Sequence, residues 1–133
     1  MDWKIVSTGS AFEKNGTFSR AIYDDEWVFV SGTSGFDYQT MAISEDFEEQ
    51  LRQTWRNIDA ALVAAGSHLG EIVSYFIFLT DRTNARLLGQ IQKQILPHRP
   101  TGTLVCTDLV DERMKVEITV TAKRRAVFAR EGG

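Results

Sequence analysis

Phe47-Glu-Glu-Gln-Leu-Arg-Gln-Thr-Trp-Arg-Asn-Ile-Asp-Ala-Ala-Leu-Val-Ala-Ala-Gly66 decides the fold, because this stretch predicts a long amphipathic helix near the middle of the chain. Apolar residues recur at helical spacing: Phe47, Leu51, Trp55, Ile58, Leu62 and Ala65. Polar residues stand between them: Glu48, Gln50, Arg52, Arg56 and Asn57. Ser44 is the expected N-cap, and Gly66 is expected to end the helix. The apolar face of such a helix needs a sheet to pack against.

Segments on both sides of this helix predict the strands of that sheet. Residues 21–23 and 27–31 read as a β-hairpin across an acidic turn, and a glycine-containing loop follows. After the helix we expect a strand at 73–80, a helix at 84–95 ended by Pro97, and strands at 103–109 and 115–122. The order β-β-α-β-α-β-β predicts an α+β fold, with two helices on one face of a mixed sheet.

Composition limits what this fold can do. The 133 residues form one expected domain, residues 1–133, and the net charge of −3 argues against nucleic acid. The basic run Lys123 to Arg125 is typical of a solvated tail. The N-terminus lacks the layout of a signal peptide, which predicts a cytoplasmic protein. The longest apolar run, residues 75–79, is too short to cross a membrane.

The strand around residues 75–79 also predicts self-association. It is apolar on both faces, whereas two helices can cover only one face of a small sheet. The other face needs a cover, which another copy of the chain would supply. The alternative is that the N-terminal segment folds over this face.

Metal and cofactor chemistry have no visible motif. His68 and His98 stand far apart in sequence, and Cys106 is single, so we expect no metal site. Gly32 and Gly35 lack the following lysine of a phosphate loop, and we expect no bound cofactor. A lone cysteine in a strand is usually a small buried hydrophobe, which is the interpretation adopted for Cys106.

The last strand carries a candidate catalytic residue. Val116, Ile118, Val120 and Ala122 alternate with Lys115, Glu117, Thr119 and Thr121, which places Glu117 in the middle of a strand expected to be central. An acid there needs a partner or a cleft. Glu117 therefore reads either as a base or water-orienting group, or as a salt-bridge or solvated interface position.

The segment His98-Arg-Pro-Thr-Gly-Thr103 is a candidate ligand edge. Its prolines and glycine hold backbone N–H groups at the mouth of the sheet, and Arg99 adds a cation able to fork onto a carboxylate. The region from Arg99 to Glu117 is where we expect the ligand to bind.

Several blocks, taken in order, resemble the Rid family, also called the YjgF or endoribonuclease L-PSP family. The resemblance runs from about Gly16 to Ala122. Its blocks are Gly16-Thr-Phe-Ser-Arg-Ala21, Val28-Phe-Val-Ser-Gly-Thr33, Gln53-Thr-Trp-Arg-Asn-Ile58, Ala64-Ala-Gly66, Arg99-Pro100 and Lys115-Val-Glu-Ile118. It implies a chorismate-mutase-like homotrimer with a central barrel, outer helices and ligand clefts between subunits. Family members of known activity hydrolyse enamines and imines to 2-keto acids and ammonia without a bound cofactor.

The resemblance also implies site residues. Glu117 matches the acid that orients water, and Ser31-Gly32 matches a segment lining the cleft. Phe18 stands at the position of an aromatic hydroxyl.

The family's Pro-Ala-Arg-Ser pattern corresponds to Pro100-Thr-Gly-Thr103, which places Gly102 at the carboxylate-binding arginine and Thr103 beside it. Arg99 or Arg20 could replace this arginine, and Arg99 is favoured because it lies in the ligand-facing segment. If the chain is extended, Arg99 is roughly 10 Å from Gly102.

The leading hypothesis is therefore a Rid relative that binds a small anionic or imine-type metabolite, and hydrolyses an imine or enamine unlike the usual amino-acid-derived one. The first alternative is a conventional 2-imino acid deaminase with a replaced arginine. The second is a non-catalytic ligand-binding or chaperone-like trimer. Ribonuclease or translation-inhibitor activity ranks last, because the chain is acidic and lacks a basic groove.

Overall fold

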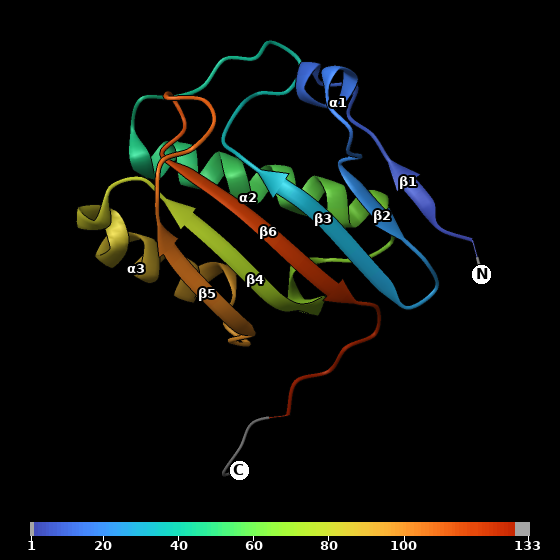
Figure 1. The fold of residues 1–133 in the computed structure, drawn as a ribbon. Helices are drawn as coiled ribbons and strands as arrows, with labels where there is room; N and C mark the ends of the chain where they lie inside the picture. The colour runs from blue at the N-terminus through green and yellow to red at the C-terminus, as the bar shows by residue number, and fades with distance from the viewer. Residues whose placement is uncertain (1, 130–133) are drawn as a thin grey trace.

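The computed structural model describes residues 2–129 as a mixed sheet of six strands with two longer helices behind it (Figure 1). The strand order is β1-β2-β3-β6-β4-β5, in which β4 and β5 are parallel and the other neighbours antiparallel. The strands are β1 Lys4–Val6, β2 Ala21–Tyr23, β3 Trp27–Thr33, β4 Ile72–Leu79, β5 Thr101–Cys106 and β6 Val116–Lys123. The helices are α1 Ala11–Asn15, α2 Phe47–Ala64 and α3 Ala85–Ile95, with short 3-10 turns η1 Leu69–Glu71 and η2 Arg82–Asn84.

The predicted α+β fold and its β-β-α-β-α-β-β order are confirmed, and two elements are added at the N-terminus. β1 pairs with β2 at the sheet edge. α1 begins at the N-cap Ser10, whose hydroxyl accepts from the Glu13 amide and donates to the Glu13 carboxylate. β5 starts and ends earlier than the predicted 103–109, because its pairing with β4 runs from Ser74 to Leu79.

α2 has the predicted body and a different N-cap. Asp46, not Ser44, caps the helix, because the Asp46 carboxylate accepts from the Glu49 amide. Ser44 lies two residues before this N-cap, and its hydroxyl accepts from the Asp46 amide. Gly66 follows the helix with a φ of +78°, a left-handed conformation that glycine adopts without a steric penalty, so its predicted role is confirmed.

The core lies between the helices and one face of the sheet. Alternate residues of β6 are buried against α2, which confirms the face predicted for Val116, Ile118, Val120 and Ala122. The core residues of α2 are Phe47, Leu51, Trp55, Ile58, Ala61 and Leu62. Central strands held in this way form a rigid support for side chains on the opposite face.

Gln50 and Asn57 do not belong to a polar outer face, contrary to the pattern. Gln50 is fully buried: its Nε2 donates to the carbonyls of Ser44 and Arg113, and its Oε1 accepts from the Lys115 amide at 2.5 Å. The Asn57 amide donates to the carbonyls of residues 34 and 36. These two side chains fasten to α2 the two loops that surround Glu117, which sequence periodicity could not indicate.

Among the described helices, α2 and α3 both lie behind the sheet, and neither covers its opposite face (Figure 1). Phe29 and Phe76 are 42% and 48% exposed there, and Val105 is 40% exposed. β1 extends the sheet at its edge, and Trp3 packs on Phe29 with ring centroids 5.8 Å apart. The N-terminal segment therefore leaves the exposed ring of Phe76 uncovered. We call this surface the open face.

Two further features bear on the sequence analysis. Cys106 is exposed, so its interpretation as a buried hydrophobe is wrong; it ends the edge strand β5, beyond the cover of α3. Among the described residues, no helix combines the length and apolarity needed to span a membrane.

Replacing Gln50 by alanine should lower the free energy of unfolding by about 2–3 kcal/mol, because three part-buried backbone groups lose their partner and the buried side chain is removed. Urea unfolding followed by circular dichroism measures the change. Arg52→Ala is the control on the same helix: its ion pair with Glu48 is exposed, and the expected loss is below about 0.5 kcal/mol. Equal losses in the two variants would contradict the role of Gln50.

Candidate functional site

A cavity of about 350 Å³ opens where β3 and β6 meet α1 and the loops that follow β3 and precede β6. We call it the Glu117 cavity. Its lining residues are Phe12, Phe18, Arg20, Ser31, Gly32, Ser34, Tyr38, Val110, Met114 and Glu117. It thus gathers five of the predicted site residues, Phe18, Arg20, Ser31, Gly32 and Glu117, from three separate segments.

Glu117 is the acid of this cavity. Burial raises the pKa of its carboxyl group above the ordinary value, and the positive charge of Arg20 opposes that rise. Gly32 lies directly against it: a Cβ on residue 32 would overlap the carboxylate oxygen of Glu117. Among the described residues, no hydrogen bond or ion pair engages this carboxylate. The group is therefore a half-buried acid that faces a cavity rather than a structural partner.

Arg20 is the cation nearest to this acid in the fold. Its side chain is 1% exposed, and its Nη1 donates to the Gly32 carbonyl at 3.0 Å and to the Thr33 hydroxyl at 3.1 Å. The rings of Phe18 and Tyr38 lie 5.6 and 4.5 Å from its guanidinium carbon. These contacts hold the guanidinium in the wall of the cavity and fix the backbone of β3 beside Glu117.

Glu13 balances the charge of Arg20, with its Oε2 3.7 Å from the Arg20 Nε. Burial raises the pKa of Glu13, but hydrogen bonds from Ser10, Thr8 and Ser7 outweigh it and lower that pKa to about 2. Glu13 is thus ionised at neutral pH. The Arg20 Nε has no hydrogen-bond partner in the described chain, so this pairing is electrostatic.

Sequence reasoning missed six residues around the site: Phe12, Glu13, Ser34, Tyr38, Val110 and Met114. One signal was present, because Ser10-Ala-Phe-Glu13 has the capping-box spacing, which predicts a helix that carries Phe12 and Glu13. The other four lie in loops whose approach to β6 depends on their anchoring to α2. No local pattern marks them.

Arg99, Gly102 and Thr103 lie outside the Glu117 cavity. Tyr75 pairs with Gly102, and Phe78 pairs with Glu117; because side chains alternate along β4, Gly102 and Glu117 belong to opposite faces of the sheet. Arg99 and Gly102 line a second cavity beneath α3. Thr103 shares the open face, but β4 separates its strand from β6. The expected ligand edge from Arg99 to Glu117 is therefore divided between two places within one chain.

Within residues 2–129, no three His, Cys, Asp or Glu side chains gather as a metal-binding group. The chemistry available in the Glu117 cavity is that of one carboxylate, one paired cation, the Ser31 and Ser34 hydroxyls and aromatic walls. Such a set can bind a small organic molecule and move a proton.

Comparison with known proteins identifies the family. The family model described as Endoribonuclease L-PSP matches residues 8–124, which include both cavities and every helix and strand from α1 to β6. The chain belongs to this family. The resemblance noted in the sequence is thereby confirmed.

TdcF from Escherichia coli K12, whose name is that of a reactive intermediate deaminase, is 29% identical over 127 residues, covering 92% of this chain and 98% of TdcF. A crystal structure of E. coli TdcF with bound serine has a TM-score of 0.81 at 28% identity, over 91% of this chain and 98% of that one. The 2-iminobutanoate/2-iminopropanoate deaminase of Salmonella typhimurium LT2 is 26% identical over 92% of this chain and 98% of its own.

A Mycobacterium tuberculosis protein of the YjgF/YER057c/UK114 family is also similar. It is 31% identical, with a TM-score of 0.83, over 92% of this chain and 99% of that one. The α+β architecture described above is thus the fold of this L-PSP family.

The low pKa of Glu13 predicts that the cavity wall formed by Glu13 and Arg20 loses stability in acid. Because folding lowers this pKa, its stabilising contribution is complete above about pH 4.5 and is lost as the pH falls toward 2. Glu13→Gln should lower the free energy of unfolding at pH 7 by about 1–2 kcal/mol, a range that allows for solvent screening. Urea titrations at pH 7, 4 and 2.5 should show the difference from wild type shrinking with acidity. The exposed Glu45→Gln is the control, and a difference independent of pH would contradict the assignment.

Proposed function

We propose that this L-PSP family member hydrolyses a small imine or enamine to a carbonyl compound and ammonia in the Glu117 cavity. The observation that carries the proposal is the half-buried Glu117 carboxylate, which faces a cavity and lacks a structural partner among the described residues. The deaminase names of TdcF and of the Salmonella protein support the same class of reaction.

Glu117 serves as the base and then as the acid. Its carboxylate takes a proton from a water molecule as the water oxygen bonds to the imine carbon, and the protonated carboxyl group returns this proton to the nitrogen to give a carbinolamine. The carboxylate then takes the carbinolamine hydroxyl proton as the C=O bond forms, and delivers it to the leaving nitrogen as the C–N bond breaks. Imine and water are converted to carbonyl compound and ammonia. An enamine enters the same sequence after protonation at carbon.

The raised pKa of Glu117 suits both roles. An acid whose pKa lies closer to neutrality is a better proton acceptor than an ordinary glutamate and a usable donor later in the same turnover. The Arg20 charge opposes this rise, which favours the ionised carboxylate that activates water. Arg20 thus positions Gly32 and tunes Glu117 through its field.

The cavity walls define the substrate class. Phe12, Phe18 and Met114 supply apolar contacts, and Phe18 brings no hydroxyl. The Arg20 Nη1 is engaged by Gly32 and Thr33, and Glu13 lies against its Nε. These features favour an imine with an apolar substituent over one that depends on a carboxylate clamp.

A conventional 2-imino acid deaminase is the second candidate. Arg20 favours it, because this arginine, rather than Arg99, shares the cavity with Glu117. In that case Arg20→Lys would raise KM for 2-imino acids at least tenfold, since a lysine cannot reproduce a forked contact with a carboxylate. An unchanged KM for imino acids would rule out this role.

We further propose that the protein works as a homotrimer whose clefts lie between subunits. The exposed aromatic residues of the open face support an assembly, and the number three comes from the family resemblance. Light scattering should give about three times the 15.0 kDa chain mass. Phe76→Asp should reduce this mass by placing a charge within the interface. A wild-type monomer at micromolar concentration would refute the assembly.

The decisive experiment supplies 2-imino acids with an amino-acid oxidase and neutral imines with an amine oxidase, and follows carbonyl appearance. Wild type should accelerate it, and Glu117→Gln should lower kcat/KM at least 100-fold. Glu112→Gln, an exposed acid on the preceding loop, is the control and should keep full activity. No acceleration with any amino-acid-derived or neutral imine would favour a binding role.

The pH profile of kcat/KM provides a separate prediction. Because burial raises the pKa of Glu117, the acid limb should lie above 4.5, the ordinary value of a glutamate. The same shift makes the ionised carboxylate unfavourable to folding as the pH rises through its folded pKa. Glu117→Gln should therefore unfold at a higher urea concentration than wild type at pH 8. A lower midpoint would show that Glu117 has a structural role.

A further inference from the structure

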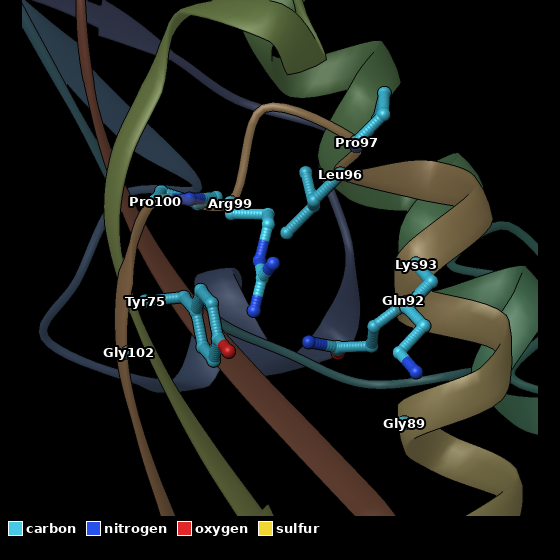
Figure 2. A pocket seen from close by; sticks show the side chains of 9 residues that line it. All are labelled: Tyr75, Gly89, Gln92, Lys93, Leu96, Pro97, Arg99, Pro100 and Gly102. Carbon is cyan, nitrogen blue, oxygen red and sulfur yellow. The ribbon is translucent and has the colours of Figure 1, made fainter. Parts of the chain in front are cut away.

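A cavity of about 230 Å³ opens on the helix layer, between α2, η1 and the C-terminal end of α3. We call it the Trp55 cavity. Its lining residues are Arg52, Trp55, Arg56, Asp59, Leu69 and Ile95. It shares no residue with the Glu117 cavity or with the cavity beneath α3 that Figure 2 shows. The hydrolysis proposed above uses none of these side chains.

One face of α2 provides most of this lining. Its residues there are Arg52, Trp55, Arg56 and Asp59. Residues three and four positions apart lie side by side on a helix surface, so these four form a continuous stripe. Leu69 of η1 and Ile95 of α3, both packed against the core, close the cavity from the other side. The cavity therefore combines apolar walls with a charged rim.

Trp55 brings an unpaired donor to this cavity. The residue is 3% exposed, and its indole Nε1–H group is buried without a hydrogen-bond partner among the described residues. The N–H group of a buried tryptophan usually has an acceptor, because a buried donor without one destabilises the fold. Since the Trp55 side chain lines the cavity, an acceptor bound there can supply this hydrogen bond. We therefore expect an oxygen acceptor on the ligand.

The two arginines of the stripe supply further donors. Arg52 donates through its Nε to the Glu48 carboxylate at 3.0 Å, and its Nη groups donate to no residue of the described chain. Arg56 is bound to Glu49 and Gln53 through its Nε and Nη2, whereas its Nη1 makes no hydrogen bond within residues 2–129. Both ion pairs are exposed to solvent and therefore weak. The arginines thus remain able to bind a carboxylate of the ligand.

Asp59 adds a group of opposite charge. Its side chain is half-buried, and within residues 2–129 no hydrogen bond or ion pair engages its carboxylate. A half-buried carboxylate without a partner attracts a cation such as an ammonium group. Asp59 lies one helical turn after Trp55, about 6 Å along the axis, so one small zwitterion can contact both residues.

We propose that the Trp55 cavity binds a small α-amino acid with an aliphatic side chain. The ligand carboxylate accepts from the Trp55 Nε1–H and from the Nη groups of Arg52 and Arg56. The ligand ammonium group forms an ion pair with Asp59. Its side chain contacts the apolar residues of η1 and α3, where the size of the cavity admits a short branched chain.

Calorimetric titration of the full chain tests this site with L-leucine and with two analogues that each lack one of its charges. Isocaproate lacks the ammonium group and isopentylamine lacks the carboxylate, so each should bind at least tenfold more weakly than leucine. Asp59→Asn should weaken leucine binding at least tenfold and leave the affinity for isocaproate unchanged. Because Asp59 has no partner in the described chain, this variant should unfold at the wild-type urea concentration.

The indole N–H signal of Trp55 provides a direct readout of the proposed contact. The chain has three tryptophans, and Trp55→Phe assigns the signal in a nitrogen–proton correlation spectrum. Leucine should move the Trp55 signal downfield, because the indole proton gains an acceptor. The indole signals of Trp3 and Trp27, which lie outside the cavity, should stay in place.

Two control variants separate this site from general charge attraction and from the Glu117 cavity. Asp108→Asn removes an exposed acid outside the Trp55 cavity, and Glu117→Gln alters the other site; both should bind leucine with wild-type affinity. The proposal is overturned if wild type does not bind leucine at millimolar concentration, or if either control loses as much affinity as Asp59→Asn. It is equally overturned if Asp59→Asn binds leucine normally, if isocaproate binds as tightly as leucine, or if the Trp55 signal does not move at saturation.

Discussion

The packing of α2 against the central strands β3 and β6 is the contact on which the rest of the structure depends. It buries one face of the sheet with aliphatic and aromatic side chains. The other face is left to be covered by another segment of the chain or by another copy of it. Figure 1 shows this one-sided arrangement, in which the helices lie behind the sheet and α1 and two loops gather at one end. The acid on the central strand β6 can face a cavity because neither α2 nor α3 covers its side of the sheet, and the short α1 adds Phe12 to the cavity wall.

A series of contacts between distant segments forms the candidate site on the open face. Gln50 ties the loop before β6 to α2, and Gly32 lets the Glu117 carboxylate approach the backbone of β3. Arg20 fixes the same backbone segment, and Glu13 neutralises Arg20 through a carboxylate ionised far below neutral pH. Each contact joins segments distant in sequence. The pKa of the proposed catalytic acid is therefore set by the whole arrangement around it.

The two faces of the sheet also carry cavities with different linings. On the open face lie an acid and aromatic walls, and on the helix side a cavity lined by cations and neutral donors. In the second cavity, a larger side chain at position 102 and a tyrosine at 75 exclude each other sterically.

Most of the fold could be predicted from sequence. Burial of one face imposes a helical or an alternating spacing on apolar residues, as it does around Leu51 and along β6. Such local spacing predicts α2, β4, α3 and β6. The same alternation placed Glu117 on the correct face. Ser10 and Glu13 carried a readable capping signal for α1.

Other features depended on the tertiary structure, because they arise from contacts between residues far apart in sequence. Gln50 and Asn57 look like solvent-facing residues, but Gln50 is buried and Asn57 half-buried, and they bind loop residues 63 and 23 positions away, respectively. Which arginine shares a cavity with Glu117, Arg20 or Arg99, also depended on contacts between distant segments. The sequence favoured Arg99 as the anion-binding cation because it lies in the expected ligand-facing segment, whereas in the fold Arg99 lines a separate cavity and Arg20 shares the cavity of Glu117. The sequence alone determined that this chain has an acid on a central strand of an α+β domain; the side-chain direction imposed by strand pairing decided what surrounds that acid.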